Sequence, residues 1–202
     1  MQAPNVTLAL DCSFTGLTLA LQAGGHTYAF STSVPRSSDI LPTELQSLLQ
    51  QAGVTVASLT HIFATTGPGS FTGIRLGLAT AQALKLLNPN IEVLGLSTLQ
   101  TLALQVVADH HPTEPFTLVL DAAGGQLYTQ TFAADATPQT PAACTATAPT
   151  GLVFAQSSLM LPATTPLTTL QPAALLAAAA NPAHHLPPQP VYLKPLTYTK
   201  AS

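Results

Sequence analysis

The sequence predicts an α/β protein made of two related lobes, each with a mixed β-sheet flanked by helices, the second lobe being reduced. In the first half of the chain, strand and helix patterns follow the order β-β-β-α-β-α-β-α, which is typical of a mixed sheet with helices packed on it. In addition, Thr7–Asp11 (TLALD) recurs as Thr117–Asp121 (TLVLD), and Leu17-Thr18 recurs at the same offset as Leu127-Tyr128. Matching offsets on both sides of a turn indicate a duplicated unit. We expect an N-terminal lobe over residues 1–100 and a smaller, degenerate lobe over 101–202.

Hydrophobic spacing and turn residues place the elements of the first lobe. A helix over Leu41–Ala52 follows from leucines at spacings of three and four, and Gly53 ends it. A further helix begins after Ser97, which with Gln100 predicts a capping box. The remaining elements are expected, in chain order, at Val6–Leu10, Leu17–Leu21, His26–Phe30, Leu59–Thr65, the helix Phe71–Leu87, and Glu92–Gly95.

The second lobe has weaker patterns. Leu152–Ala155 predicts a strand, and Pro172–Ala180 predicts a helix that begins with proline. The Thr/Pro/Ala-rich stretch 133–150 is interpreted as irregular strand and loop, and residues 190–195 as a short extended piece.

Composition favours a protein partner over nucleic acid or membrane. Only 6% of the 202 residues are charged, against about 25% in typical soluble domains. A surface so poor in charge does little to keep molecules apart, and a lasting partner would cover it. The net charge is −3 with five Lys plus Arg, so strong direct binding of nucleic acid is not expected.

Several other classes are disfavoured. The longest apolar run of the region after residue 136, Ala173–Ala180, is far shorter than the ~20 residues that span a membrane, and no basic leader precedes the first apolar run. Cys12 and Cys144 are interpreted as ordinary thiols of a reducing compartment, so we expect a cytoplasmic protein. The histidines form adjacent pairs, whose side chains diverge, and no metal site is expected.

The most specific motif is the turn and helix start between residues 65 and 77. Gly67 and Gly69 suit a tight turn, and Ser70 is a good helix N-cap. Small residues then recur every fourth position along one helix face, at a cost of about 1 kcal/mol for each glycine: Gly73, Gly77 and Ala81. This stripe predicts a helix that packs closely against another backbone.

Two functional interpretations of this segment remain open. Arg75 is the only Lys, Arg, Asp or Glu between Leu45 and Lys85, and it forms either a partner contact or an intramolecular salt bridge. The turn could also hold an anion at the helix N-terminus. It lacks the Gly-Lys-Ser/Thr ending of a nucleotide-binding loop, so we interpret it as a structural turn.

The two Asp-containing turns resemble the phosphate loops of the actin-like (ribonuclease H-like) architecture. There an Asp offers an oxygen to a metal, and small residues offer backbone amides to phosphates. Only Gly151 occurs after Gly125, and no lysine lies near either turn in the sequence. We therefore interpret them as inherited hairpins with degenerate phosphate-loop residues, namely Asp11, Ser13, Asp121 and Gly125. The alternative is a stand-alone actin-like ATPase or kinase that uses Asp11 and Asp121.

The motif Gly67–Gly77 resembles the signature of the bacterial TsaB (YeaZ) family. Leu96–Leu99 gives supporting similarity, as do Asp121-Ala122, Gly125, Tyr128 and Pro190–Leu193. The resemblance covers Val6 to about Phe132 and resumes at residue 190. Ala123 and Gln126 stand where the family has Arg and Glu, so any polar role of those two positions is in doubt.

This resemblance implies a non-catalytic subunit that works in making N6-threonylcarbamoyladenosine (t6A) on tRNA. It would dimerise with the catalytic TsaD subunit through its first two helices, and a TsaE-type ATPase would join them. ATP and magnesium would be used by the complex, with no cofactor bound tightly by this chain, and tRNA would be met only through the complex. Alone, the same face could form a homodimer. The expected contacts are Leu41, Leu45, Leu48, Phe71, Gly73, Ile74, Arg75, Gly77, Leu78 and Ala81.

Overall fold

A five-stranded mixed sheet forms the first half of the protein. The computed structural model describes residues 5–34, 36–159 and 161–194. The strands lie in the order β3-β2-β1-β4-β5. β1 is antiparallel to β2, as β2 is to β3, whereas β1–β4 and β4–β5 are parallel. The bounds are β1 Thr7–Asp11, β2 Leu17–Ala23, β3 His26–Thr32, β4 His61–Gly67 and β5 Glu92–Ser97.

The second sheet repeats this topology strand for strand. Its order, read from the other edge, is β8-β7-β6-β9-β10. Each neighbouring pair has the orientation of its counterpart in the first sheet. The duplication predicted from two short sequence repeats is therefore confirmed, and the fold is actin-like (ribonuclease H-like). The bounds are β6 Phe116–Asp121, β7 Leu127–Phe132, β8 Ala143–Thr145, β9 Leu152–Gln156 and β10 Thr165–Leu167.

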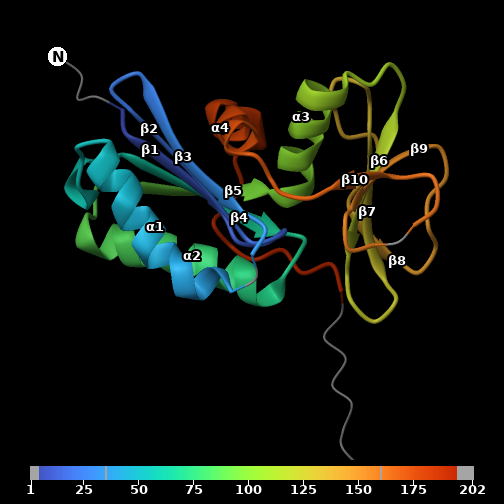
Figure 1. Ribbon diagram of the computed structural model, residues 1–202, viewed down its shortest axis with the longest axis horizontal. Helices are drawn as coiled ribbons and strands as arrows, with labels where there is room; N and C mark the ends of the chain where they lie inside the picture. Colours follow the sequence, from blue (N-terminus) through green and yellow to red (C-terminus); the bar gives the residue numbers. More distant parts are fainter. Residues whose placement is uncertain (1–4, 35, 160, 195–202) are drawn as a thin grey trace, which may run out of the picture.

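The helices are distributed unequally over the two sheets (Figure 1). α1 (Ser37–Gln51) and α2 (Phe71–Leu87) cover one face of the first sheet, whereas α3 (Thr98–His110) and α4 (Pro172–Ala180) lie between the two sheets. In the described part of the second lobe, no helix connects β8 to β9 or β9 to β10. The second lobe has thus lost its counterparts of α1 and α2. Two single 3₁₀ turns complete the structure, η1 (Val56–Ser58) and η2 (Pro182–His184).

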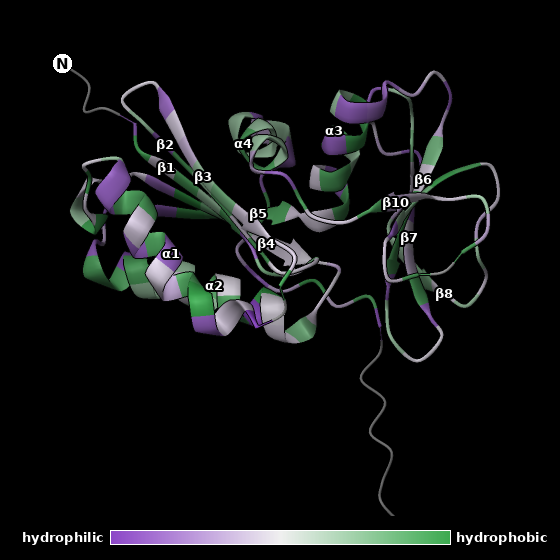
Figure 2. Ribbon diagram, in the orientation of Figure 1, coloured by the Kyte–Doolittle hydropathy of each residue, from purple (hydrophilic) through white to green (hydrophobic). Residues whose placement is uncertain are grey.

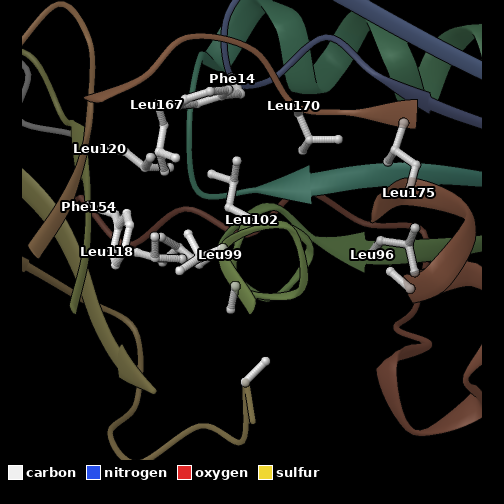
Figure 3. Packing of buried hydrophobic residues seen from close by; sticks show 14 of the residues in the cluster. Phe14, Leu96, Leu99, Leu102, Leu118, Leu120, Phe154, Leu167, Leu170 and Leu175 are labelled. Atoms are coloured by element: carbon white, nitrogen blue, oxygen red, sulfur yellow. The ribbon is translucent and has the colours of Figure 1, made fainter. Parts of the chain in front are cut away.

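Two large hydrophobic clusters hold these layers together. One fills the space between the sheets, where Leu99 and Leu102 of α3 pack toward Leu118 and Phe154 of the second sheet (Figure 3). The other lies under α1 and α2, on the opposite face of the first sheet. Because α4 contributes Leu175 to the first cluster and lies against β1 and β2, residues from the C-terminal half complete the packing of the N-terminal sheet.

Most element positions agree with the sequence prediction, and α2 and α4 have the predicted bounds. α1 begins at Ser37, before the predicted start at Leu41, and β8 and β10 are additional strands. The Ser97 N-cap is confirmed by a 3.3 Å hydrogen bond from the Gln100 amide. The Gln100 side chain does not close a capping box, because it donates to the Ala136 carbonyl at 2.9 Å. Pro195, the end of the predicted extended piece, lies outside the described residues. The division into lobes at about residue 100 stays a prediction.

Candidate functional site

The start of α2 lies in direct backbone contact with the turn between β1 and β2. A Cβ atom on Gly73 would lie 1.7 Å from the Cys12 carbonyl oxygen, and one on Gly69 would lie 2.3 Å from that of Ser13. The Ser70 amide donates to the same Ser13 carbonyl at 2.7 Å, while the Ser70 hydroxyl caps α2 by accepting from the Gly73 amide at 3.2 Å. The glycines of this motif therefore allow α2 to begin on top of the first Asp turn.

The small-residue stripe of α2 faces the chain's own sheet. Gly77 lies over Leu10 of β1, whose Cδ1 would be 3.1 Å from an added Cβ, and Ala81 is fully buried. The prediction of a closely packed backbone is confirmed for Gly73, where that backbone is the chain's own. The sequence also predicts that Gly77→Arg breaks a partnership and leaves the chain folded. The burial of Gly77 corrects this, because an arginine there would clash with the core.

Eight of the ten expected contact residues are buried inside the chain. Six of them belong to the cluster between the first sheet and its two outer helices, Gly73 lies against the Cys12 carbonyl, and Gly77 lies against the Leu10 side chain. A side chain buried in its own core has no surface to offer to a partner, so direct contact does not hold for these positions. They are Leu41, Leu45, Leu48, Gly73, Ile74, Gly77, Leu78 and Ala81. Only Phe71 and Arg75 are exposed, and their contact with a partner stays a prediction.

The outer face of α2 is exposed, apolar and almost uncharged. Ala79 and Ala83 lie along it, and Leu86 and Leu87 are 83% and 75% exposed. Its only charges are Arg75 and Lys85. Figure 2 shows α2 mostly in green and white, in agreement with this composition. Leu86 and Leu87 were not predicted from the sequence, although both fall outside the every-fourth-residue stripe that begins at Gly73, which is a usable signal.

Arg75 forms no salt bridge with any described residue. Its guanidinium carbon lies 3.9 Å from the centre of the Phe71 ring, and its Nε donates to the Tyr192 hydroxyl at 3.0 Å. The Phe71 and Tyr192 rings are themselves in contact, with centroids 5.1 Å apart. The sequence left two interpretations of Arg75 open, an intramolecular salt bridge and a partner contact. The described residues contain no such salt bridge, so the partner contact remains.

Asp11 is fully buried and its carboxylate is occupied by the chain's own donors. Oδ1 accepts from the Ser13 amide at 2.9 Å, from the Ser13 hydroxyl at 2.5 Å and from the Thr65 hydroxyl at 2.6 Å. Oδ2 accepts from the Phe14 amide at 3.3 Å. Burial, with the nearby Asp11 charge, also raises the pKa of the Cys12 thiol far above its usual value, which keeps it protonated. Asp11 and Ser13 thus stabilise the turn.

Asp121 repeats the same local geometry in an exposed setting. Its Oδ1 accepts from the Ala123 amide at 2.7 Å, as Asp11 accepts from the amide two residues on. Lys194 reaches this turn and donates to the Ala122 and Ala123 carbonyls at 3.1 and 2.9 Å. The expectation that no lysine lies near either turn is thus corrected, since the C-terminal segment brings one there. A Cβ on Gly125 would meet nothing within 4 Å, so that side of the turn is open.

Neither a metal-ligand cluster nor a helix that could span a membrane occurs among the described residues. No group of three or more His, Cys, Asp and Glu side chains among them is arranged to hold a metal ion. His110 lies against Phe154 and is exposed, whereas His185 is half-buried, with its Nε2 2.8 Å from the Ala179 carbonyl oxygen. Within the same residues, every helix is too short or too polar to cross a membrane.

Comparison with known proteins identifies the family. Residues 32–148, more than half of the chain, match the model of the family described as TsaD: tRNA N6-adenosine threonylcarbamoyltransferase. Over 123 residues the chain is 32% identical to the tRNA threonylcarbamoyladenosine biosynthesis protein TsaB of Escherichia coli, covering 60% of this chain and 52% of that protein. Over 126 residues it is 30% identical to the TsaB of Buchnera aphidicola, covering 61% of this chain and 59% of that protein. The chain thus spans between half and three-fifths of the length of these curated relatives.

Solved structures show the same fold. The structure of YeaZ from Pseudomonas aeruginosa superposes with a TM-score of 0.76 at 22% identity, covering 94% of this chain and all of the other. The chain therefore belongs to the TsaD family, and among the proteins compared it is similar in sequence to TsaB.

Proposed function

We propose that this chain is a non-catalytic, cytoplasmic subunit of the complex that makes t6A at position 37 of tRNA, where it dimerises with a TsaD-type catalytic subunit and supports it. The names of its TsaB relatives support the pathway. The observation that carries the docking role is the outer face of α2, because Leu86 and Leu87 are 83% and 75% exposed, and Arg75 and Lys85 are the only charged side chains of the helix. Apolar surface removed from water contributes about 25 cal/mol per Å², so a partner that covers this face gains stability.

The proposed mechanism is scaffolding. α1 covers the same face of the first sheet as α2, and its Pro42, Gln46 and Gln50 are also exposed, so the two helices offer one broad surface without dense charge. Equivalent helices of a TsaD-type subunit would pack on it. Because the first sheet and the buried stripe of α2 hold this surface rigidly, docking would keep the catalytic subunit in its competent form. That subunit would then move the threonylcarbamoyl group from its adenylate to the tRNA.

An accessory role also fits the state of the first Asp turn. The Asp11 carboxylate accepts four hydrogen bonds, three from its own turn and one from Thr65. Few of its lone pairs are therefore free to bind a metal ion. ATP and magnesium would therefore be used by the complex, with a TsaE-type ATPase as its third subunit. With five Lys plus Arg in the whole chain, tRNA would be bound mainly by the other subunits.

Reconstitution of the modification tests this proposal. TsaD-type and TsaE-type subunits of the same organism would be supplied with threonylcarbamoyl adenylate, ATP, magnesium and unmodified tRNA. We expect sustained t6A formation at position 37 only when this chain is added. Equal t6A formation in its absence would contradict the proposal.

The alternative, a stand-alone ATPase or kinase that uses Asp11 and Asp121, makes a different prediction. It requires measurable ATP affinity in the isolated chain, lost in both Asp11→Asn and Asp121→Asn. Calorimetric titration with Mg-ATP distinguishes the two, since a scaffold binds the nucleotide weakly or not at all.

A further inference from the structure

The segment after η2 forms a strap along one side of the molecule. Leu186 pairs with Gly95 of β5 through hydrogen bonds of 2.7 and 2.9 Å, and the Val191 amide donates to the Thr66 carbonyl at 2.8 Å. Lys194 then holds the second Asp turn by its carbonyls. Figure 1 shows this segment, in red, running from the first sheet toward the second lobe. We call residues 186–194 the C-terminal strap.

The strap meets α2 in an exposed cluster of Phe71, Arg75 and Tyr192, named here the aromatic–arginine cluster. Phe71 and Tyr192 are 43% and 40% exposed, and the adjoining Val191 is 39% exposed. The Arg75 guanidinium lies over one ring and is hydrogen-bonded to the hydroxyl of the other. Stacking and this hydrogen bond hold a long, flexible side chain in a fixed orientation at the surface.

The fixed guanidinium still has donors to offer. Nε is used by Tyr192, whereas Nη1 and Nη2 have no acceptor among the described residues. α2 contains no acidic residue, and the described ion pairs involve Arg36 and His61 only. A guanidinium presents its N–H groups in a planar fork that matches a carboxylate. A carboxylate that pairs with this fork would therefore come from outside the described residues, and a partner subunit can supply one.

We propose that the C-terminal strap is part of the docking surface, and that it holds Arg75 in place for an Asp or Glu side chain of the TsaD-type subunit. This inference rests on the proposed function and deepens it, since it adds a polar anchor to the apolar face of α2. The neighbours of the cluster are apolar side chains of α2 and Val191, which suit a protein surface. A tRNA phosphate is disfavoured because backbone binding needs several cations, and Lys194 is already held by two carbonyls.

The test measures the affinity of full-length variants for the TsaD-type subunit of the same organism. Arg75→Ala and Tyr192→Ala should each weaken binding by about 5-fold to 50-fold, the range of an interface hot spot. Their combined effect should be smaller than the product, since both remove the same anchor. Arg75→Lys should not restore affinity, because an ammonium lacks the fork. Lys85→Ala, which removes the other cation of α2, should change affinity by less than about 2-fold.

The possible affinities of the variants separate the inference about the C-terminal strap from the proposed function. Arg75 and Tyr192 are exposed, so melting temperatures should stay close to that of the unchanged chain, and a loss of affinity would report docking. If both variants bind as tightly as the unchanged chain while Ala83→Glu abolishes binding, the strap inference fails and the proposed function stands. If the unchanged chain does not bind at all, both fail. Normal subunit affinity with weakened tRNA binding by the complex would overturn the inference in favour of a phosphate.

Discussion

At the scale of single residues, Gly73 is the position with the least room for a side chain. A Cβ added at Gly73 would lie 1.7 Å from the Cys12 carbonyl oxygen. Both the Cβ position and this oxygen are fixed by the backbone, so no side-chain rotation relieves the overlap. We expect Gly73→Ala to lower the free energy of unfolding by at least about 3 kcal/mol, the upper end for overpacked sites. Gly24→Ala is the control, because that glycine has open space around it and a left-handed φ that costs about 1–2 kcal/mol. Equal urea midpoints for the two variants would contradict the packing account.

Asp11 and Asp121 occupy equivalent positions in the two Asp turns, so the same substitution can be compared in a buried and an exposed setting. Asp11→Asn places an NH₂ group where a buried carboxylate accepts four hydrogen bonds, so we expect a loss of about 1–3 kcal/mol. Asp121→Asn changes an exposed side chain and should cost less than about 0.5 kcal/mol. Urea unfolding of both variants measures the difference. A structural role for Asp11 is contradicted if its variant is as stable as the unchanged chain.

The sequence predicted the residues whose role is local and missed those whose partners are distant. Ser70 caps α2 from within its own turn, and its role follows from its neighbours. Arg75 depends on Tyr192, which is 117 positions away, so spacing along the chain could not choose between its two interpretations. For the same reason Lys194 was not placed at the second Asp turn.

At the scale of elements, α3 connects the two halves through buried amide side chains. Gln105 donates to the Thr169 carbonyl at 3.1 Å and accepts from the Gln171 amide at 2.9 Å, just before α4 begins. We expect Gln105→Ala to cost about 1–3 kcal/mol, because it leaves two backbone groups without partners. Gln82→Ala, on the exposed face of α2, should change stability by less than about 0.5 kcal/mol. Thermal unfolding of both variants measures the difference, and equal melting temperatures would argue against a stabilising role of the Gln105 hydrogen bonds.

The outer face of α2 can be tested apart from its buried face. Ala83→Glu introduces a charge in the middle of the exposed surface, with no Lys or Arg one turn away to neutralise it. We expect the affinity for the TsaD-type subunit to fall by about 10-fold or more, since an unpaired charge would be desolvated at the interface. Ala177→Glu is the control, because Ala177 is also exposed on a helix, α4, but on the other side of the first sheet. Similar affinities for the two variants would place the partner elsewhere.

Helix and strand positions were predictable where the pattern was long, and less so where it was short. The 17 residues of α2 carry both a cap and a periodic stripe, so its bounds were correct. β8 and β10 have three residues each, lie in Thr/Pro-rich sequence, and form only because a longer strand stands beside them. The helical stripe was recognised, but periodicity alone could not tell whether it faced the chain's own sheet or a partner.

At the scale of the whole molecule, duplication and loss create one distinctive surface. Both sheets have the same strand order, yet within residues 5–34, 36–159 and 161–194 only the first has helices on its outer face. The outer face of the second sheet keeps a small apolar cluster around Val119 and Val153, covered by loop residues such as Leu159. The helix pair is therefore the feature that a second, similar subunit could match with its own equivalent helices, and this symmetry favours a pairwise complex.

The mass in solution of this chain mixed with the TsaD-type subunit of the same organism tests the central claim most directly. Light scattering after size-exclusion chromatography should show a one-to-one heterodimer, and Ala83→Glu in this chain should return the two subunits to separate peaks. Separate peaks for the unchanged pair at micromolar concentrations would contradict the account, because membership of the family would then not extend to a partnership with TsaD.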